Sequence, residues 1–173
     1  MIESVIRTVM TNFTVTFFVI GLLCAGVALL RAPRPLGAAL IVEKLLAWFV
    51  FWTVGVLYAY NGFFHIFFGE MAAAYIGWAD SPFQFEVGVA SLGFAFIGFF
   101  AAFRSFELRV AAIVGSAIFL IGAAIGHAWQ IALTHNMAPG NAGIMFYSDI
   151  ALPIIGFVLL GLQWRADAKG GHL

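Results

Sequence analysis

Residues 110–133 read VAAIVGSAIFLIGAAIGHAWQIAL and contain no Lys, Arg, Asp or Glu. A helix needs roughly 20 mainly apolar residues to cross the hydrocarbon core of a bilayer, and this segment supplies them. Four further segments of the same character are bounded by charges, prolines or polar loops, and they run over about 11–30, 39–68, 85–103 and 148–164. The sequence therefore predicts an all-α, integral membrane helical bundle with five transmembrane helices, formed by a single domain over residues 1–173.

The composition of the whole chain agrees with this prediction. Of 173 residues, 64% are hydrophobic and only 9% are charged, whereas soluble domains carry about 25% charged residues. A chain this apolar is neither a soluble globular protein nor a disordered one. The formal net charge is +0 and the basic residues do not cluster, which excludes nucleic acid as a main partner. The single cysteine, Cys24, excludes an intrachain disulfide and a cysteine-based metal cluster.

The distribution of basic residues predicts the orientation, because cytoplasmic loops are enriched in Lys and Arg. The opposite loops, 69–84 and 134–147, contain neither residue, and only Arg7 argues against this assignment. We therefore expect the N-terminus outside and the C-terminus inside, in a multi-pass protein of the cell inner (plasma) membrane. The basic residues that follow the first, third and fifth segments are Arg31, Arg34, Arg104, Arg109, Arg165 and Lys169.

Small residues predict which helices pack closely, because helices in lipid approach one another through Gly, Ala and Ser faces. The third and fourth segments both repeat such residues every three or four positions, so we expect these two helices to lie close together. The residues are Gly88, Ser91, Ala95, Gly98 and Ala102 on the third segment and Gly115, Gly122 and Gly126 on the fourth.

Ionisable residues within the predicted helices indicate a candidate site, because charges in a membrane are costly and mark functional positions. Counting about 20 residues from the inner boundary of each helix predicts that ionisable residues of four helices lie at the same depth, just beneath the outer surface. The side chains predicted at this depth are His65, Glu86, His127 and Asp149, with Asn61, Gln130 and Tyr147 to orient them.

Two histidines and two carboxylates are residue types that helical bundles use to bind zinc, iron or manganese. His65 and His127 are also potential axial ligands of haem b, and a polar pocket at this depth suits a quinone, a lipid or another small apolar molecule. The remaining alternative is a hydrogen-bonded plug that fixes helix packing and binds nothing. The Glu-x-x-His and His-Glu-x-x-His spacings of known metal sites are absent, so the sequence leaves the cofactor open.

Two further motifs carry a resemblance to known proteins. The segment Gly77–Gly88, GWADSPFQFEVG, together with NGFFH at 61–65, resembles a family of small uncharacterised bacterial integral membrane proteins. That family in turn looks loosely DoxX-like, over about residues 55–131. The resemblance implies a similar membrane bundle with one added helix, and DoxX-type proteins include some associated with quinone-linked sulfur or redox-defence reactions. It transfers no catalytic residue to this chain.

Together these observations predict an outer-leaflet polar pocket that binds a metal ion or a small redox-active or apolar ligand such as a quinone. Whether the protein is an enzyme is left open. The alternative function is a non-catalytic structural or accessory subunit of a larger membrane complex, with lipid, other membrane subunits or further copies of the chain as partners. A channel or transporter ranks below both, because one layer of ionisable groups gives no continuous path across the membrane.

Overall fold

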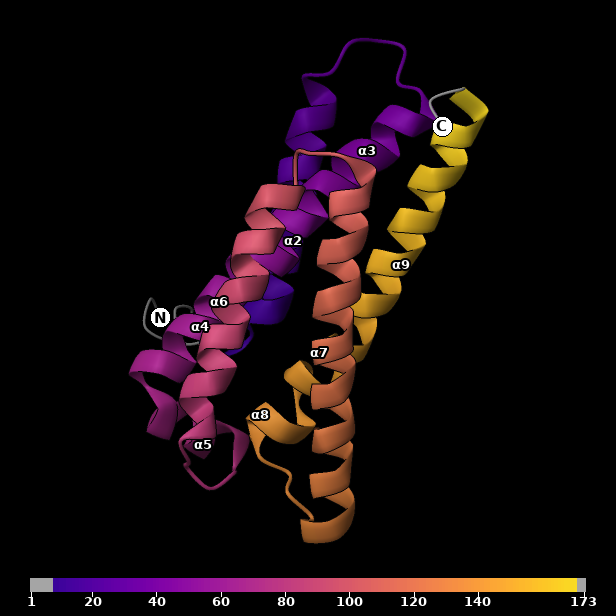
Figure 1. Ribbon diagram of the computed structural model, residues 1–173. Helices are drawn as coiled ribbons and strands as arrows, with labels where there is room; N and C mark the ends of the chain where they lie inside the picture. Colours follow the sequence, from indigo (N-terminus) through magenta and orange to yellow (C-terminus); the bar gives the residue numbers. More distant parts are fainter. Residues whose placement is uncertain (1–7, 171–173) are drawn as a thin grey trace.

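The computed structural model describes residues 8–170, and the secondary structure in this part of the chain is helical, without strands. Five long antiparallel segments form an elongated bundle (Figure 1). Its elements are α2 (Phe13–Leu30), α3 (Ala38–Phe49), the π-helix η1 (Val50–Val56), α4 (Leu57–Phe67), α5 (Gly69–Ile76), α6 (Phe83–Ala101), α7 (Phe106–Thr134), α8 (Pro139–Ala142) and α9 (Ile144–Gly170).

Five of the described helical segments are long and apolar enough to cross a membrane, which confirms the predicted number. Some ends differ from the prediction. α7 begins earlier than expected, at Phe106, because Arg109 does not end the helix but is buried inside the bundle against Glu43 of α3. α9 also begins earlier and continues past Trp164 to Gly170, so Asp149 lies well inside the helix rather than at its first turn.

The second segment is a continuous helical rod made of α3, η1 and α4, and it is the main partner of α6. A Cβ atom added to Gly98 would lie 2.5 Å from the backbone nitrogen of Gly55, and one added to Gly62 would lie 2.9 Å from the carbonyl oxygen of Gly88. These backbones touch in a way that only glycine permits. The small-residue face of α6 therefore packs against the second segment, while α7, which the sequence places close to α6, contacts it less extensively.

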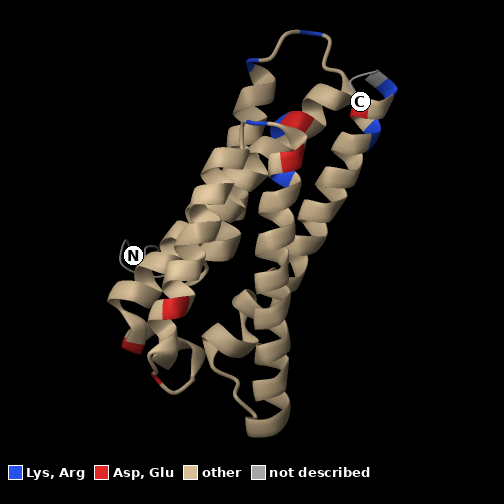
Figure 2. Ribbon diagram, in the orientation of Figure 1, with Lys and Arg blue, Asp and Glu red and all other residues tan. Residues whose placement is uncertain are grey.

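Charged residues divide between the two ends of the bundle (Figure 2). All of the described lysines and arginines lie toward the end formed by the α2–α3 loop, the α6–α7 turn and the C-terminal part of α9. The loops at the other end, 69–84 and 134–147, contain only acidic or uncharged residues. Arg7, which argued against the predicted orientation, lies outside the described residues.

Two loops at the end without basic residues are tied to each other. Gly77 ends α5 with a φ of 75°, a left-handed conformation that favours glycine. The side-chain amide of Asn136, in the loop after α7, donates to the carbonyls of Ile76 and Gly77 at 3.0 and 3.2 Å. This contact joins the α5–α6 connection to the α7–α8 connection and holds both over the end of the bundle.

Candidate functional site

A cavity of about 590 Å³ lies inside the bundle, toward the end without basic residues. We call it the larger cavity. Aliphatic and aromatic side chains form most of its wall, with contributions from α2, α4, α6, α7 and α9. A concave, mainly apolar space with a few polar groups is typical of a small-molecule site. The polar residues that line it are Thr14, Tyr58, Asn61, His65, Trp78, Ser81, Gln84, His127 and Asp149.

His127 on α7 and Asp149 on α9 form an interhelical pair in the wall of the larger cavity. His127 Nε2 lies 3.6 Å from Asp149 Oδ2, and each residue is only 5% exposed. A direct N–H···O hydrogen bond spans roughly 2.7–3.2 Å, so this pair is not closed by one. Neither atom therefore has its bonding capacity used by the other in this arrangement.

Asn141 determines which ring nitrogen of His127 carries a hydrogen. Its Oδ1 accepts from the indole N–H of Trp78 at 3.0 Å, while its Nδ2 donates to the carbonyls of Asn136 and His127 at 2.9 and 3.4 Å. Indole nitrogen only donates and carbonyls only accept, so the amide has one orientation. The same Oδ1 lies 2.8 Å from His127 Nδ1, which therefore carries the hydrogen. Nε2 is left facing Asp149 and able to bond a ligand.

His65 and Asn61 form a second polar group on one face of α4, since they are four residues apart. His65 Nδ1 lies 2.6 Å from Gln84 Oε1, and Asn61 Nδ2 donates to Ser91 Oγ at 3.0 Å. Both partners come from α6. The close packing of α4 on α6 thus positions the two polar side chains that line the larger cavity from this side.

Thr14 supplies a third polar feature. It lies in the first turn of α2, is 3% exposed and lines the larger cavity. Among the described residues, no group forms a hydrogen bond with its Oγ1 atom. Buried polar atoms nearly always have a partner, and an exception calls for a specific explanation. A hydrogen-bonding ligand in the larger cavity would supply the partner that this hydroxyl lacks.

A family model matches residues 11–169, a range that includes every residue of this site. It describes a family of unknown function, DUF6790. The chain belongs to this family. No curated protein matches the chain, and no solved structure does. Membership of a family of unknown function, DUF6790, confirms that part of the resemblance, and the likeness to DoxX proteins stays a prediction.

Glu86 of this DUF6790 chain does not join the site, which corrects its predicted placement. α6 buries Gly88 and Ser91 against its neighbours, and Glu86 precedes Gly88 by two residues. Two residues turn a helix by about 200°, so Glu86 is exposed on another side. Counting residues from the inner boundary locates the end of α6, but it does not show on which side of the helix Glu86 lies. Gln84 precedes Gly88 by a full turn, and it is the α6 residue that contacts His65.

Two of the predicted orienting residues also lie elsewhere. Tyr147 is 65% exposed, because it precedes the buried Asp149 by two residues and therefore points away from the bundle. Gln130 is half-buried, and its Oε1 accepts a hydrogen bond from Thr134 at 3.2 Å rather than from the site. Of the three predicted orienting residues, Asn61 alone is among those that line the larger cavity.

The predicted metal centre is not supported. Within residues 8–170, no three His, Cys, Asp or Glu side chains are grouped so that they could hold a metal ion. His65, His127 and Asp149 do line the same cavity, but Glu86 is exposed outside it. A zinc, iron or manganese ion would therefore lack Glu86, the fourth of the predicted ligands.

The sequence analysis does not name several residues of the site as candidates, among them Thr14, Trp78, Gln84 and Asn141. Two of them could have been identified from the sequence, because Gln84 shares the helical face of Gly88, and Asn141 is a polar residue in the short turn between two predicted membrane helices. Thr14 and Trp78 could not have been identified in this way. Their role depends on how α2 and the α5–α6 connection fold over the cavity, which no local pattern predicts.

Proposed function

We propose that this protein is a multi-pass membrane protein that binds a quinone-type molecule in the larger cavity. The observation that carries the proposal is a cavity of about 590 Å³ into which a buried, incompletely closed His127–Asp149 pair and an unpartnered Thr14 hydroxyl are built. The volume lies in the range of about 300–1,000 Å³ that is typical of small-molecule sites. The looser DoxX likeness, with its quinone-linked members, agrees with this proposal.

The chemistry of the wall suits a flat ring with polar atoms at its edge. Quinone carbonyls accept hydrogen bonds, and quinol hydroxyls donate them. Thr14 offers a hydroxyl that both donates and accepts, and the His127–Asp149 pair offers groups that do either, according to where its proton lies. Trp78 lies against His127 with ring centroids 5.4 Å apart, and together with Phe119 it gives the cavity aromatic surface for a ring to pack on.

Membrane insertion is the second part of the proposal. Large apolar side chains are exposed along the length of the bundle, among them Phe96, Phe100 and Ile118 at 69%, 71% and 69%. Such surface needs an apolar surrounding. The basic end faces the cytoplasm by the rule that Lys and Arg mark cytoplasmic loops. The larger cavity then lies in the outer leaflet of the inner membrane, with the N-terminus outside and the C-terminus inside.

Binding is tested by titrating the detergent-purified protein with decylubiquinone and following tryptophan fluorescence. We expect saturable quenching, because Trp78 lines the larger cavity. His127→Asn should weaken binding at least tenfold, which corresponds to the loss of about one hydrogen bond. His135→Asn is the matched control, since His135 is exposed at the end of the same helix and asparagine tolerates its φ of 53°. Quenching that never saturates would refute the proposal.

Orientation is tested by labelling single cysteines in intact cells, in a Cys24→Ser background. Asp80→Cys and Met137→Cys occupy exposed positions in the two loops without basic residues, and Ser105→Cys is exposed at the opposite end. We expect a membrane-impermeant maleimide to react with the first two variants and not with the third. The reverse pattern would place the larger cavity in the cytoplasmic leaflet.

An accessory subunit is the alternative function, and one observation favours it. A groove of about 450 Å³ between α7 and α9 is lined entirely by apolar residues, and Ile125, Ile154 and Phe157 in it are exposed. A helix of another subunit would fit such a groove through van der Waals packing. Purification of the chain in a stable complex, together with no saturable ligand binding, would favour this alternative over the quinone site.

A further inference from the structure

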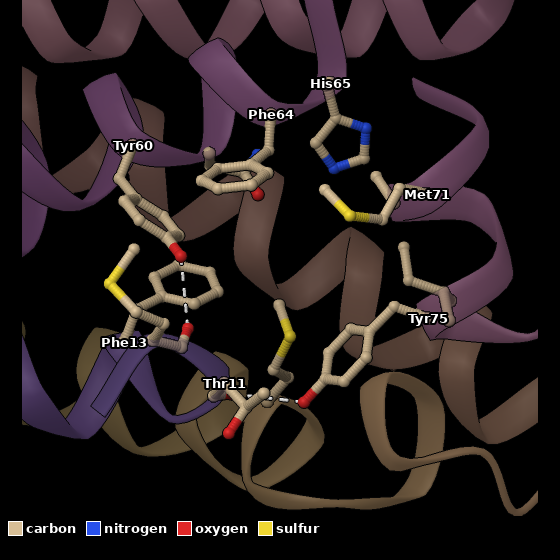
Figure 3. A pocket seen from close by; sticks show the side chains of 12 residues that line it. Thr11, Phe13, Tyr60, Phe64, His65, Met71 and Tyr75 are labelled. Carbon is tan, nitrogen blue, oxygen red and sulfur yellow. Dashed lines mark hydrogen bonds between the residues drawn. The ribbon is translucent and has the colours of Figure 1, made fainter. Parts of the chain in front are cut away.

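A smaller cavity of about 220 Å³, whose lining residues are drawn in Figure 3, lies beside the larger one. The two share a wall, because Phe13, Asn61, His65, Ile76 and Met145 line both. The polar pair on α4 therefore stands at the junction of the two spaces. A molecule bound in the larger cavity has the smaller cavity as its immediate neighbour.

The smaller cavity differs from the larger one in having few polar groups available to a ligand. The Tyr60 hydroxyl donates to the carbonyl of Met10 at 3.2 Å, and the Tyr75 hydroxyl donates to the carbonyl of Thr11 at 3.1 Å. Figure 3 shows both bonds, with the tyrosine rings facing the interior. Burial raises the pKa of the Tyr75 hydroxyl, which keeps this group neutral and able to donate. What remains for a ligand is mainly ring and methionine surface.

The smaller cavity also reaches the surface of the bundle. Met10 and Met71, which line it, are 42% and 51% exposed. Methionine side chains are unbranched and adaptable, so they suit a wall that contacts flexible apolar chains. Asn61 and His65, which line both cavities, and the exposed Met10 and Met71 of the smaller cavity thus mark one path from the larger cavity to the surface.

We propose that the smaller cavity binds the hydrocarbon chain of the same ligand whose polar ring lies in the larger cavity. This inference rests on the proposed function and specifies its ligand class: a molecule with a hydrogen-bonding ring and an apolar chain, rather than a ring alone. A volume of about 220 Å³ is below the range of roughly 300–1,000 Å³ that separate small-molecule sites occupy, so a chain fits it better than a second ligand does.

The test compares decylubiquinone with its ring analogue that has a methyl group in place of the chain. Ala72→Phe fills the smaller cavity, because Ala72 lines it and does not line the larger one. We expect this variant to bind decylubiquinone at least tenfold more weakly and the chainless ring within twofold of the unaltered protein. Ala74→Phe is the matched control on the same helix, where Ala74 is exposed, and it should leave both affinities unchanged.

The outcomes separate this inference from the function on which it rests. If Ala72→Phe weakens both compounds equally, or neither, the chain does not occupy the smaller cavity, although the ring site stands. If the unaltered protein binds neither compound saturably, the proposed function itself fails. Should circular dichroism show that Ala72→Phe has lost helicity, Met71→Trp narrows the same cavity from its exposed rim and carries the same expectation.

Discussion

Helix α7 carries two interhelical pairs of ionisable side chains, one toward each end, and they are closed to different degrees. Near its start, Arg109 Nη2 lies 3.0 Å from Glu43 Oε1, and Lys44 Nζ lies 2.9 Å from the second oxygen of the same carboxylate. About 27 Å farther along the helix, at a rise of 1.5 Å per residue, His127 faces Asp149 across 3.6 Å. The first pair bonds within itself, whereas the second faces a cavity.

This difference distinguishes a structural pair from a candidate binding pair in a bundle with few charged residues. Both pairs join buried or half-buried residues on neighbouring helices, so burial alone does not separate them. Geometry does, because Arg109 and Glu43 lie within hydrogen-bonding distance of each other, whereas His127 and Asp149 do not. In the open pair, Asn141 fixes the hydrogen on His127 Nδ1 and leaves Nε2 toward Asp149. We interpret the closed pair as structural and the open pair as part of a binding site.

The largest expected effect comes from breaking the closed pair. Glu43→Gln leaves Arg109, whose side chain is 6% exposed, without its carboxylate partner. Removing one member of a buried pair typically costs 3–5 kcal/mol, and because Glu43 is itself partly exposed we expect about 3 kcal/mol. Unfolding in a dodecyl sulfate titration measures this free energy. Glu107→Gln, exposed near the same end of α7, should change it by less than about 0.5 kcal/mol.

A glycine in each region extends the comparison to packing. Gly98→Ala places a Cβ 2.5 Å from the backbone nitrogen of Gly55, so α6 must move away from η1 at a cost of about 2 kcal/mol. Gly122→Ala lies in the wall of the larger cavity, where nothing would lie within 4 Å of the new atom. It should be neutral or stabilising, since alanine favours helix by up to about 1 kcal/mol over glycine. The same unfolding titration compares the two variants, and equal losses would contradict this account of the packing.

Changing the open pair should separate stability from binding. Asp149→Asn keeps the size of the side chain and, because the pair is not directly hydrogen-bonded, should lower the free energy of unfolding by only about 1 kcal/mol. Decylubiquinone affinity should fall at least tenfold in the fluorescence titration. A stability loss as large as that of Glu43→Gln, with binding retained, would show that this pair is structural too.

The smallest effect is expected at Glu86. Because its side chain is exposed outside both cavities, Glu86→Gln should change stability by less than about 0.5 kcal/mol and leave quinone affinity unchanged. Both quantities come from the unfolding and fluorescence titrations already described. A tenfold loss of affinity in this variant would restore Glu86 to the site and overturn its placement.

Glu86 also illustrates how much of the molecule the sequence could predict. Length, hydropathy and the spacing of charges predict the five apolar segments and the common depth of His65, His127 and Asp149. All of these features describe positions along a helix axis. The direction in which a side chain points around the axis is harder to predict in an all-apolar helix, because its outward-facing and core-facing residues are alike. Glu86 and Tyr147 were therefore assigned to the site although both point outward.

The main partner of α6, the second segment, is hard to predict for a related reason. Glycines at Gly88 and Gly98 correctly indicated a close helix crossing, yet nothing in their spacing names the opposite helix. The structure pairs them with Gly62 and Gly55 on the second segment. Glycines on both sides of a crossing would have been the signal, since two backbones in contact need small residues on each.

Photoaffinity labelling determines whether a quinone ring lies in the larger cavity. The protein in membranes is illuminated with an azido-quinone, with and without excess decylubiquinone, and the labelled peptides are mapped by mass spectrometry. We expect labels on residues such as Val87, Phe119 and Ala123, which line the larger cavity and not the smaller one, and their loss in the presence of competitor. Labels confined to exposed positions such as Phe96 or Phe100, unchanged by competitor, would contradict this expectation.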